Sequence, residues 1–560
     1  MSMSLLFFLF LFLSVLISSS PAPYPYDTVY HIDCGSPTAL TDSFNTTWQP
    51  DTFYTGGFTS IVSEPLHFRL PQEKTLRYFP LSSGKKNCYV VPLPHGRYYL
   101  RTFTVYDNYD GKSHSPSFDT SVEGTVVFSW RSPWQANLAR DGAYSDLFAF
   151  VTDGELDLCF YSIATDPPLI GSLSIVQIDP LSYGAGNDYV LVNYGRLSCG
   201  SQQWGPGFSN DTDNFGRSWQ SDAEFRSSSG SNSVRAVGTR ERIANTNQGP
   251  NYFPMKLYQT AVMGSEGVEY ALEVDAKLDY LLWFHFAEID SSVSKAGERV
   301  FDVVVNERNV SRIDIVANVG SFAAFDWNYT VKNLTATVLS VKLVPVVGAV
   351  LICGLENYAL LPPDLSTMPD QVIAMRALKE SLRVPNRMGW NGDPCAPTNW
   401  DAWEGVTCRP NKDDTALVIF QIDLGSQGLK GYISDQIGLL SNLVSVNLSS
   451  NSLGGTLPSG LGQNSLVRLD LSNNRFSGSI PDSLTSSNLQ LVLLNDNLLE
   501  GRVPEELYSI GVHGGAIDLS GNKGLCGVPS LPECPLFWGN GGLSTGGEIK
   551  TIMTLVCLKI

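Results

Sequence analysis

A leucine repeat in the last third of the chain constrains the fold more than any other feature. The frame Leu-x-x-Leu-x-Leu-x-x-Asn, with Val accepted at the second leucine, occurs at residues 443–451, 466–474 and 489–497. With looser flanking copies, successive central leucines are 24, 23, 23 and 25 residues apart: Leu424, Leu448, Leu471, Leu494 and Leu519. This period is that of a leucine-rich repeat solenoid.

One turn of such a solenoid cannot bury its own leucines, so stacked turns build a shared core whose two ends need caps. The recurrent Asn lies where the chain bends away from each strand, and its amide can satisfy backbone groups there. Two cysteine pairs flank the repeats, and neither has zinc-finger spacing, so we expect both to be disulfide-closed caps: Cys395 with Cys408, and Cys526 with Cys534.

The solenoid offers a candidate binding surface on its concave face. The strand residues expected to point away from the leucine core form a column with one member per turn: Asp423, Asn447, Asp470, Leu493 and Asp518. Three of the five are acidic, which favours a basic peptide or partner. A merely solvated polar face is the alternative, and Asn447 also lies in a glycosylation sequon, so a glycan could cover this face.

The region upstream of the repeats predicts β-structure. Short apolar or alternating runs such as 98–105, 171–178 and 301–305 are bounded by turn-forming residues and are typical of strands. The segment 31–36 resembles 196–201, which indicates an internal repeat. We therefore expect a mainly β protein, with tandem β-sandwiches followed by a short α/β solenoid.

The domain boundaries follow from these patterns. We expect sandwiches over residues 30–180 and 188–361, then a linker, an amphipathic helix at 370–382 and the first repeat cap over 362–415. The repeats and their second cap take up residues 416–534. The Gly-rich tail over 535–560 contains too few consecutive apolar residues to span a membrane. We therefore expect the chain to end before any membrane-spanning helix.

Several features predict export from the cytosol. Residues 1–22 read as a signal peptide. Asn-x-Ser/Thr sequons, the acceptors of N-glycans, occur at Asn45, Asn210, Asn309, Asn328, Asn333 and Asn447. The formal net charge of −18 disfavours nucleic acid as a partner, and 43% hydrophobic residues exclude a mainly disordered chain. Five upstream cysteines form an odd set, which leaves at least one thiol: Cys34, Cys88, Cys159, Cys199 and Cys353.

These residues together resemble plant receptor-like proteins that carry a malectin-like ectodomain followed by leucine-rich repeats. The resemblance rests on the motifs at 33–35, 106–111, 391–395 and 400–408. It implies a kinase-less, cell-surface or secreted glycoprotein that recognises a carbohydrate or peptide and signals through a partner receptor kinase. A membrane anchor would then belong to another isoform. The alternative is a secreted, lectin-like protein of the cell wall that acts without a signalling partner.

Malectin-type modules bind sugars by stacking them on aromatic rings and bonding their hydroxyls. One loop has this composition and follows an expected strand: Tyr106, Asp107, Asn108, Tyr109 and Asp110. Packing in a turn is its alternative role. The equivalent stretch 284–289 lacks the tyrosine pair, so the site is expected in the first sandwich. No catalytic motif, metal cluster or cofactor motif is apparent, and we expect a non-enzyme without cofactors.

Overall fold

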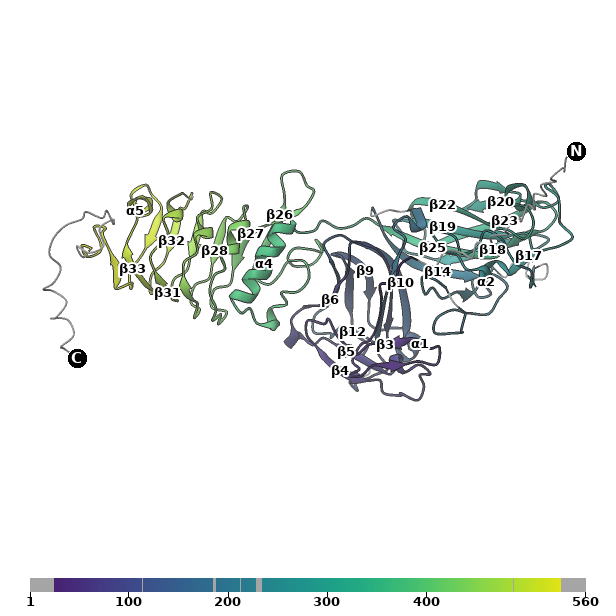
Figure 1. Ribbon diagram of the computed structural model, residues 1–560, viewed down its shortest axis with the longest axis horizontal. Coiled ribbons are helices and arrows are strands. Elements are labelled where there is room, and N and C mark those ends of the chain that lie inside the picture. The colour runs from purple at the N-terminus through teal and green to yellow at the C-terminus, as the bar shows by residue number, and fades with distance from the viewer. Residues whose placement is uncertain are drawn as a thin grey trace, which may run out of the picture. The chain divides into compact units, whose positions relative to one another are not determined.

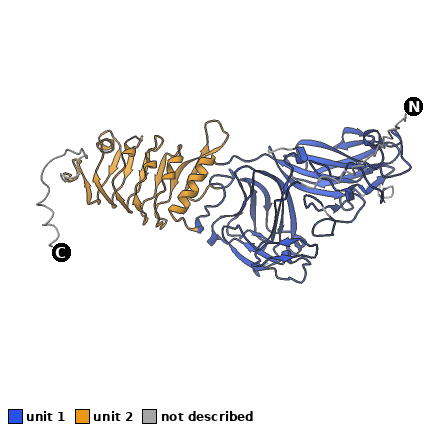
Figure 2. Cartoon of the chain, viewed as in Figure 1, with its two compact units in different colours: residues 1–366, 386–400 blue, residues 367–385, 401–560 orange. Residues whose placement is uncertain are grey.

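The computed structural model describes residues 25–534 except 113, 185–187, 212, 228–233 and 487 (Figure 1). The expected signal peptide and the tail 535–560 lie outside the described residues. The chain divides into two compact units (Figure 2). One unit, here called the sandwich unit, contains residues 1–366 and 386–400; the other, the repeat unit, contains 367–385 and 401–560.

A single large sheet runs through the sandwich unit. Eight strands follow the order β1 (Val29–Asp33), β13 (Ser172–Ile178), β7 (Gly96–Thr104), β10 (Ala143–Val151), β14 (Val190–Ser198), β25 (Gly354–Leu361), β19 (Leu278–Ala287) and β22 (Ala324–Leu334), and β15 (Gln220–Ser221) pairs with β14. The first four strands come from the first half of the unit and the others from the second. The two expected sandwiches are therefore joined edge to edge through β10 and β14.

Each half adds a second sheet, as a sandwich requires. In the first half its order is β6 (Lys86–Pro92), β11 (Glu155–Ser162), β8 (Phe118–Val122) and β9 (Thr125–Trp130). In the second half it is β18 (Val268–Glu273), β23 (Val338–Val347), β20 (Val300–Val305) and β21 (Arg308–Ile313). Buried and half-buried residues alternate along β20, because only one of its faces packs on the core. The buried residues are Phe301, Val303 and Val305. All nine residues of β7 are buried, since both of its faces are covered.

The internal repeat is visible as a duplicated turn. Gly35 and Gly200 both have positive φ, and a Cβ on either would lie 2.4 Å from a carbonyl oxygen. Each glycine donates its backbone N–H to an aspartate, Asp51 at 2.7 Å or Asp222 at 3.0 Å. Each of these aspartates also accepts a tyrosine hydroxyl and pairs with an arginine. The matching contacts show that the two halves share one local design.

The five upstream cysteines form fewer disulfides than their number allows. Cys88 and Cys159 form a disulfide between neighbouring strands β6 and β11. Cys34, Cys199 and Cys353 are free and fully buried, so three thiols are left over rather than one. Cys34 and Cys199 occupy equivalent places in the duplicated turn, which separates them into different halves.

Residues 386–400 belong to the sandwich unit, although the sequence suggested a repeat cap. Lys86 donates from Nζ to the backbone oxygens of Asp393 at 2.7 Å and Ala396 at 2.9 Å. Trp400 stacks on Tyr161 with ring centroids 5.2 Å apart. A buried ammonium needs such acceptors, and these contacts hold the segment against β6 and β11. Cys395, in this segment, and Cys408, in the repeat unit, are both disulfide-bonded.

The repeat unit is the expected solenoid. The helix α4 (Pro369–Ser381) confirms the prediction at 370–382. Strand β26 (Val406–Pro410) pairs antiparallel with β27 (Leu417–Asp423), and β28 (Ser445–Asn447), β30 (Arg468–Asp470), β32 (Leu491–Leu493) and β34 (Ala516–Asp518) continue the sheet in parallel. A second sheet contains β29 (Gly454–Thr456), β31 (Arg475–Gly478), β33 (Leu498–Arg502) and β35 (Gly524–Cys526). Cys526 and Cys534 form a disulfide at its end.

The repeated asparagines satisfy backbone groups of the preceding turn. Asn474 donates from Nδ2 to the carbonyl of Leu448 at 2.9 Å and accepts the N–H of Leu453 at 3.0 Å. Asn451, Asn497 and Asn522 make the same two contacts one turn earlier or later. Because the turn residues lack a strand neighbour, this ladder replaces the hydrogen bonds that a sheet would provide.

Candidate functional site

The loop 106–110 is brought together as predicted, but its tyrosines serve mainly in packing. Tyr106 is 4% exposed, and its hydroxyl donates to Asp110 at 2.8 Å. Tyr109 is half-buried and packs on Tyr78, with ring centroids 5.1 Å apart. Asp107 accepts the backbone N–H of Glu64 at 2.6 Å. A sugar could not stack on the buried Tyr106 ring, and Asn108 is the exposed member of the loop.

The parallel strands of the solenoid place the five residues of the predicted column in register. Asp423, Asn447, Asp470, Leu493 and Asp518 are successive partners across the parallel strands. Several polar side chains of this column already form hydrogen bonds within the solenoid. Asn447 donates from Nδ2 to Asp423 at 2.8 Å, and Asp470 accepts the hydroxyl of Ser472 at 2.7 Å.

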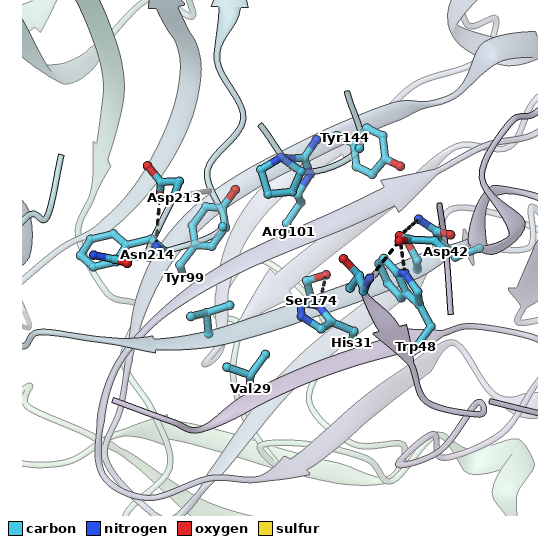
Figure 3. A pocket seen from close by; sticks show the side chains of 18 residues that line it. Val29, His31, Asp42, Trp48, Tyr99, Arg101, Tyr144, Ser174, Asp213 and Asn214 are labelled. Carbon is cyan, nitrogen blue, oxygen red and sulfur yellow. Dashed lines mark hydrogen bonds between the residues drawn. The ribbon is translucent and has the colours of Figure 1, made fainter. Parts of the chain in front are cut away.

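A cavity of about 230 Å³ lies on one face of the large sheet, and sequence analysis did not find it (Figure 3). Strands β1, β13, β7 and β10 contribute its sheet residues, and the hairpin of β2 (Leu40–Thr41) and β3 (Thr47–Trp48) contributes one wall. Residues 206–207 and 213–216 of the second half contribute another wall. Its aromatic lining consists of Trp48, Tyr99, Tyr144 and Phe215. Figure 3 shows Arg101 beside Tyr144, and the guanidinium lies 4.2 Å from the centroid of that ring.

Two buried polar atoms of the cavity wall have no hydrogen-bond partner among the described residues. They are Oη of Tyr99, which is 1% exposed, and Oε1 of Gln72, which is 2% exposed. Leaving such atoms unpaired costs about 1–3 kcal/mol each unless water or a ligand pairs with them. Aromatic walls with a few convergent polar groups are typical of small-ligand sites.

His31 lines the same cavity and is held neutral. Its Nδ1 lies 3.0 Å from the hydroxyl of Ser174. Burial lowers the pKa of His31 to about 4, although the nearby carboxylate of Asp42 acts in the opposite direction. Asp42 itself is 9% exposed and accepts the indole N–H of Trp48 at 3.0 Å. The cavity wall therefore combines one neutral imidazole with a carboxylate that is already engaged.

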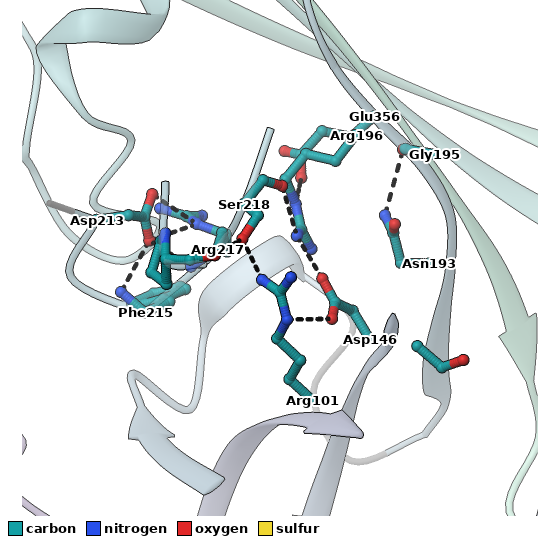
Figure 4. Close-up of polar contacts among 12 residues, drawn as sticks. Arg101, Asp146, Asn193, Gly195, Arg196, Asp213, Phe215, Arg217, Ser218 and Glu356 are labelled. Carbon is teal, nitrogen blue, oxygen red and sulfur yellow. Dashed lines mark hydrogen bonds and ion pairs between the residues drawn. The ribbon is translucent and has the colours of Figure 1, made fainter. Parts of the chain in front are cut away.

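A chain of alternating charges runs from Arg101 across the sheet (Figure 4). Asp146 lies 3.7 Å from Arg101 and 2.8 Å from Arg196, and Arg196 lies 2.9 Å from Glu356. His285 continues the chain, with its two ring nitrogens 3.1 Å from Glu356 and 2.7 Å from Asp326. Six strands, β7, β10, β14, β25, β19 and β22, each contribute one member, so register alone brings them together.

The pKa values of this charge chain follow from its geometry. Burial acts to raise the pKa of Glu356, but hydrogen bonding from His285 and the charges of Arg196 and Arg217 lower it to about 2. Burial acts to lower the pKa of His285, and its hydrogen bonds to Asp326 and Glu356 outweigh that effect and raise it. Glu356 is thus charged near neutral pH, and His285 holds a proton more readily than a free imidazole does.

The sequons at Asn45, Asn210, Asn309, Asn328 and Asn333 are exposed, as N-glycosylation needs, whereas Asn447 is half-buried. Within the described residues, no helix is long and apolar enough to cross a bilayer. The same residues contain no group of three or more His, Cys, Asp or Glu side chains placed to hold a metal ion.

Comparison with known families gives two matches. The model of the malectin-like domain matches residues 32–360, which span both halves of the sandwich unit. The leucine-rich repeat model matches residues 442–464 and 465–487.

Similar proteins come from Arabidopsis thaliana. Receptor-like protein 4 is 34% identical over 431 residues, which cover 74% of this chain and 67% of the relative. A probable LRR receptor-like protein kinase is 28% identical over 436 residues, covering 74% of this chain and 46% of the kinase. The chain thus spans about half the length of the kinases it matches.

Solved ectodomains share the fold. The receptor-like kinase FER superposes with a TM-score of 0.53 at 20% identity, covering 60% of this chain and 96% of that one. The ANX1 ectodomain from Arabidopsis thaliana gives 0.54 at 19%, with the same coverage. A crystal structure of the peptide RALF23 in complex with FER and LLG2 also matches, with a TM-score of 0.52 at 19% identity and again 60% and 96% coverage.

Proposed function

Because this chain belongs to the plant receptor-like proteins with a malectin-like domain and leucine-rich repeats, we propose that it is an extracellular recognition protein that acts with a partner receptor kinase. In this proposal it works at the cell surface or in the wall and catalyses no reaction. Its ligand carries a carbohydrate ring or a peptide side chain that enters the cavity of Figure 3. A peptide in complex with the similar FER ectodomain supports the peptide form.

The cavity's two unpaired polar atoms carry this proposal. Tyr99 Oη can donate and accept, while Gln72 Oε1 can only accept. The guanidinium of Arg101 and the ring of Tyr144 lie against the same space. A ligand group with an apolar face and at least one hydroxyl or amide N–H would satisfy this lining, whereas a purely apolar group would not.

The test is to find a ligand on glycan and peptide arrays with the secreted chain, and then to measure its affinity for Tyr99→Phe. Because the Tyr99 hydroxyl has no partner among the described residues, its removal should leave the unfolding free energy within about 0.5 kcal/mol and weaken binding about tenfold. Tyr98→Phe is the matched control. Its hydroxyl donates to Pro94 O at 2.8 Å, so that variant should lose about 1 kcal/mol of stability and keep its affinity.

The partner is tested separately by affinity capture from plasma membranes. Recovery of a receptor kinase that depends on the array ligand supports signalling. Ligand binding without any kinase supports the lectin-like alternative. Ligand affinity that is unaffected by Tyr99→Phe would contradict the assignment of the cavity.

A further inference from the structure

A second concave site lies beside strand β9 and shares only Tyr144 with the lining of the cavity of Figure 3. It is a groove of about 670 Å³. Six consecutive residues, 126–131, line it. Neighbouring residues of a strand point to opposite faces of the sheet, so a groove lined by an unbroken run follows the edge of the strand.

The edge of β9 is open. This strand ends the order β6-β11-β8-β9, and within the described residues it pairs with β8 alone. The opposite wall of the groove is formed by strands β10 and β14. These strands pair only at Leu147–Val192 and Phe148–Leu191 and diverge beyond those positions. Residues of both diverging strands line the groove: Tyr144, Ser145, Asn193 and Tyr194. An open edge presents backbone N–H and C=O groups that can pair with a further strand.

The residues that line the groove indicate which kind of peptide segment could bind in it. Phe128, Trp130, Trp134 and Tyr194 make it strongly aromatic. Its two ionised side chains are already engaged: Arg131 pairs with Asp119 at 2.6 Å, and Asp275 accepts the hydroxyl of Tyr194. Because Arg131 has a carboxylate partner and Asp275 is already hydrogen-bonded, neither side chain requires a charged partner, and an uncharged segment suits the aromatic lining.

Other strand edges carry sequons. Asn309 lies on β21, which ends the sheet of the second half, and Asn328 and Asn333 lie on β22, which ends the large sheet. All three asparagines are exposed, so glycans there would keep other chains from pairing with these edges. Strand β9 has no sequon, so no glycan attached to the strand itself blocks its edge.

We propose that the β9 edge binds an extended, uncharged peptide segment of a partner protein, which adds a fifth strand beside β9. Backbone hydrogen bonds hold the segment, and its alternate apolar side chains enter the aromatic groove. The six residues of β9 match a segment of about 20 Å. This inference does not depend on what occupies the cavity.

The test uses the secreted, glycosylated chain and a blocked octapeptide of alternating Val and Thr. The comparison peptide has the same sequence with every backbone nitrogen methylated, which removes its N–H donors. The test variant combines Ser129→Asn with Arg131→Thr, which creates a sequon on the exposed position of β9. Ser129→Gln combined with Arg131→Thr is the matched control, because it changes the same two side chains but lacks the sequon and therefore the glycan.

We expect saturable binding of the octapeptide, at least tenfold weaker binding of the methylated peptide, and new hydrogen-exchange protection over residues 125–130. The glycosylated variant should bind at least tenfold more weakly than its matched control, and enzymatic glycan removal should bring its binding back to that of the control. Absence of saturable binding, equal binding of the methylated peptide, or equal binding by the glycosylated variant would overturn the proposal. So would self-association of the wild-type chain that the new glycan abolishes, because the occupant would then be a second copy.

Discussion

The repeat unit and the sandwich unit bury polar groups in opposite ways. In the repeat unit, asparagines such as Asn474 are buried among leucines and satisfied by the backbone of the preceding turn. In the sandwich unit, charged side chains such as Arg196 and Glu356 are buried and satisfied by one another, while Tyr99 Oη and Gln72 Oε1 have no partner among the described residues. Polar burial in the solenoid thus serves architecture, whereas in the sandwich unit it also leaves groups available for recognition.

The largest effect should come from breaking the charge chain. Glu356→Gln leaves Arg196 and His285 without their shared carboxylate in a buried site. We expect the free energy of unfolding to fall by about 3–5 kcal/mol, as measured by urea denaturation of the sandwich unit's transition. Glu269→Gln is the control, because its pair with Lys342, at 3.1 Å, lies at the surface. That variant should lose less than about 1 kcal/mol, and equal losses in the two variants would contradict the role given to the chain.

The second-largest effect is expected from a substitution in the asparagine ladder of the solenoid. Asn474→Ala removes four hydrogen bonds and leaves the buried N–H of Leu453 unpaired, whereas the carbonyls of Leu448 and Leu471 keep Asn451 and Asn497 as donors. We expect a loss of about 2–3 kcal/mol from the repeat unit's transition. Asn464→Ala, at an exposed position of the same repeat, should change stability by less than about 0.5 kcal/mol. If the two variants behave alike, the ladder does not stabilise the solenoid as its geometry indicates.

The same contrast explains what could be predicted from the sequence. Each solenoid turn repeats one local pattern, so the spacing of Leu448 and Asn451 within a single repeat is enough to indicate their roles. The charge chain has no such local signal, because Arg101 and Glu356 lie on strands far apart in sequence and meet only through strand register. The cavity also needs residues 206–207 and 213–216 from the second half. One available signal was the presence of polar side chains such as Tyr99 and Arg101 in β7, a strand whose residues are all buried.

Substitutions in the loop 106–110 distinguish a packing role of its side chains from a role in ligand binding. Tyr109→Ala should lower the free energy of unfolding by about 2 kcal/mol, because the ring packs on Tyr78 and Tyr106. Tyr109→Phe keeps the ring and should be nearly neutral, since the hydroxyl has no partner among the described residues. Thermal unfolding of both variants measures the effect. Loss of ligand binding in Tyr109→Ala with an unchanged melting temperature would instead restore this loop as a ligand contact.

The smallest expected effect is a pH dependence that originates in the cavity. The pKa of His31 is about 4 in the folded protein against 6.5 in the unfolded chain, chiefly because the imidazole is buried. As pH falls from 6.5 towards 4, the unfolded chain therefore takes up a proton that the folded protein does not, and stability declines through this window. We expect the decline to reach about 1–2 kcal/mol.

His31→Gln isolates this contribution, because the difference between variant and wild type removes the effects of other groups. Asp33 is one such group: burial raises its pKa to about 6, so its protonation favours the folded state as pH falls from 6 towards 4. Unfolding free energies measured at several pH values between 4 and 7 should show a shallower acid decline for His31→Gln than for wild type. Parallel curves would mean that His31 is more accessible to water than the cavity geometry indicates. A ligand that fills the cavity should deepen the wild-type decline further, because protonation of His31 would then also disturb the bound state.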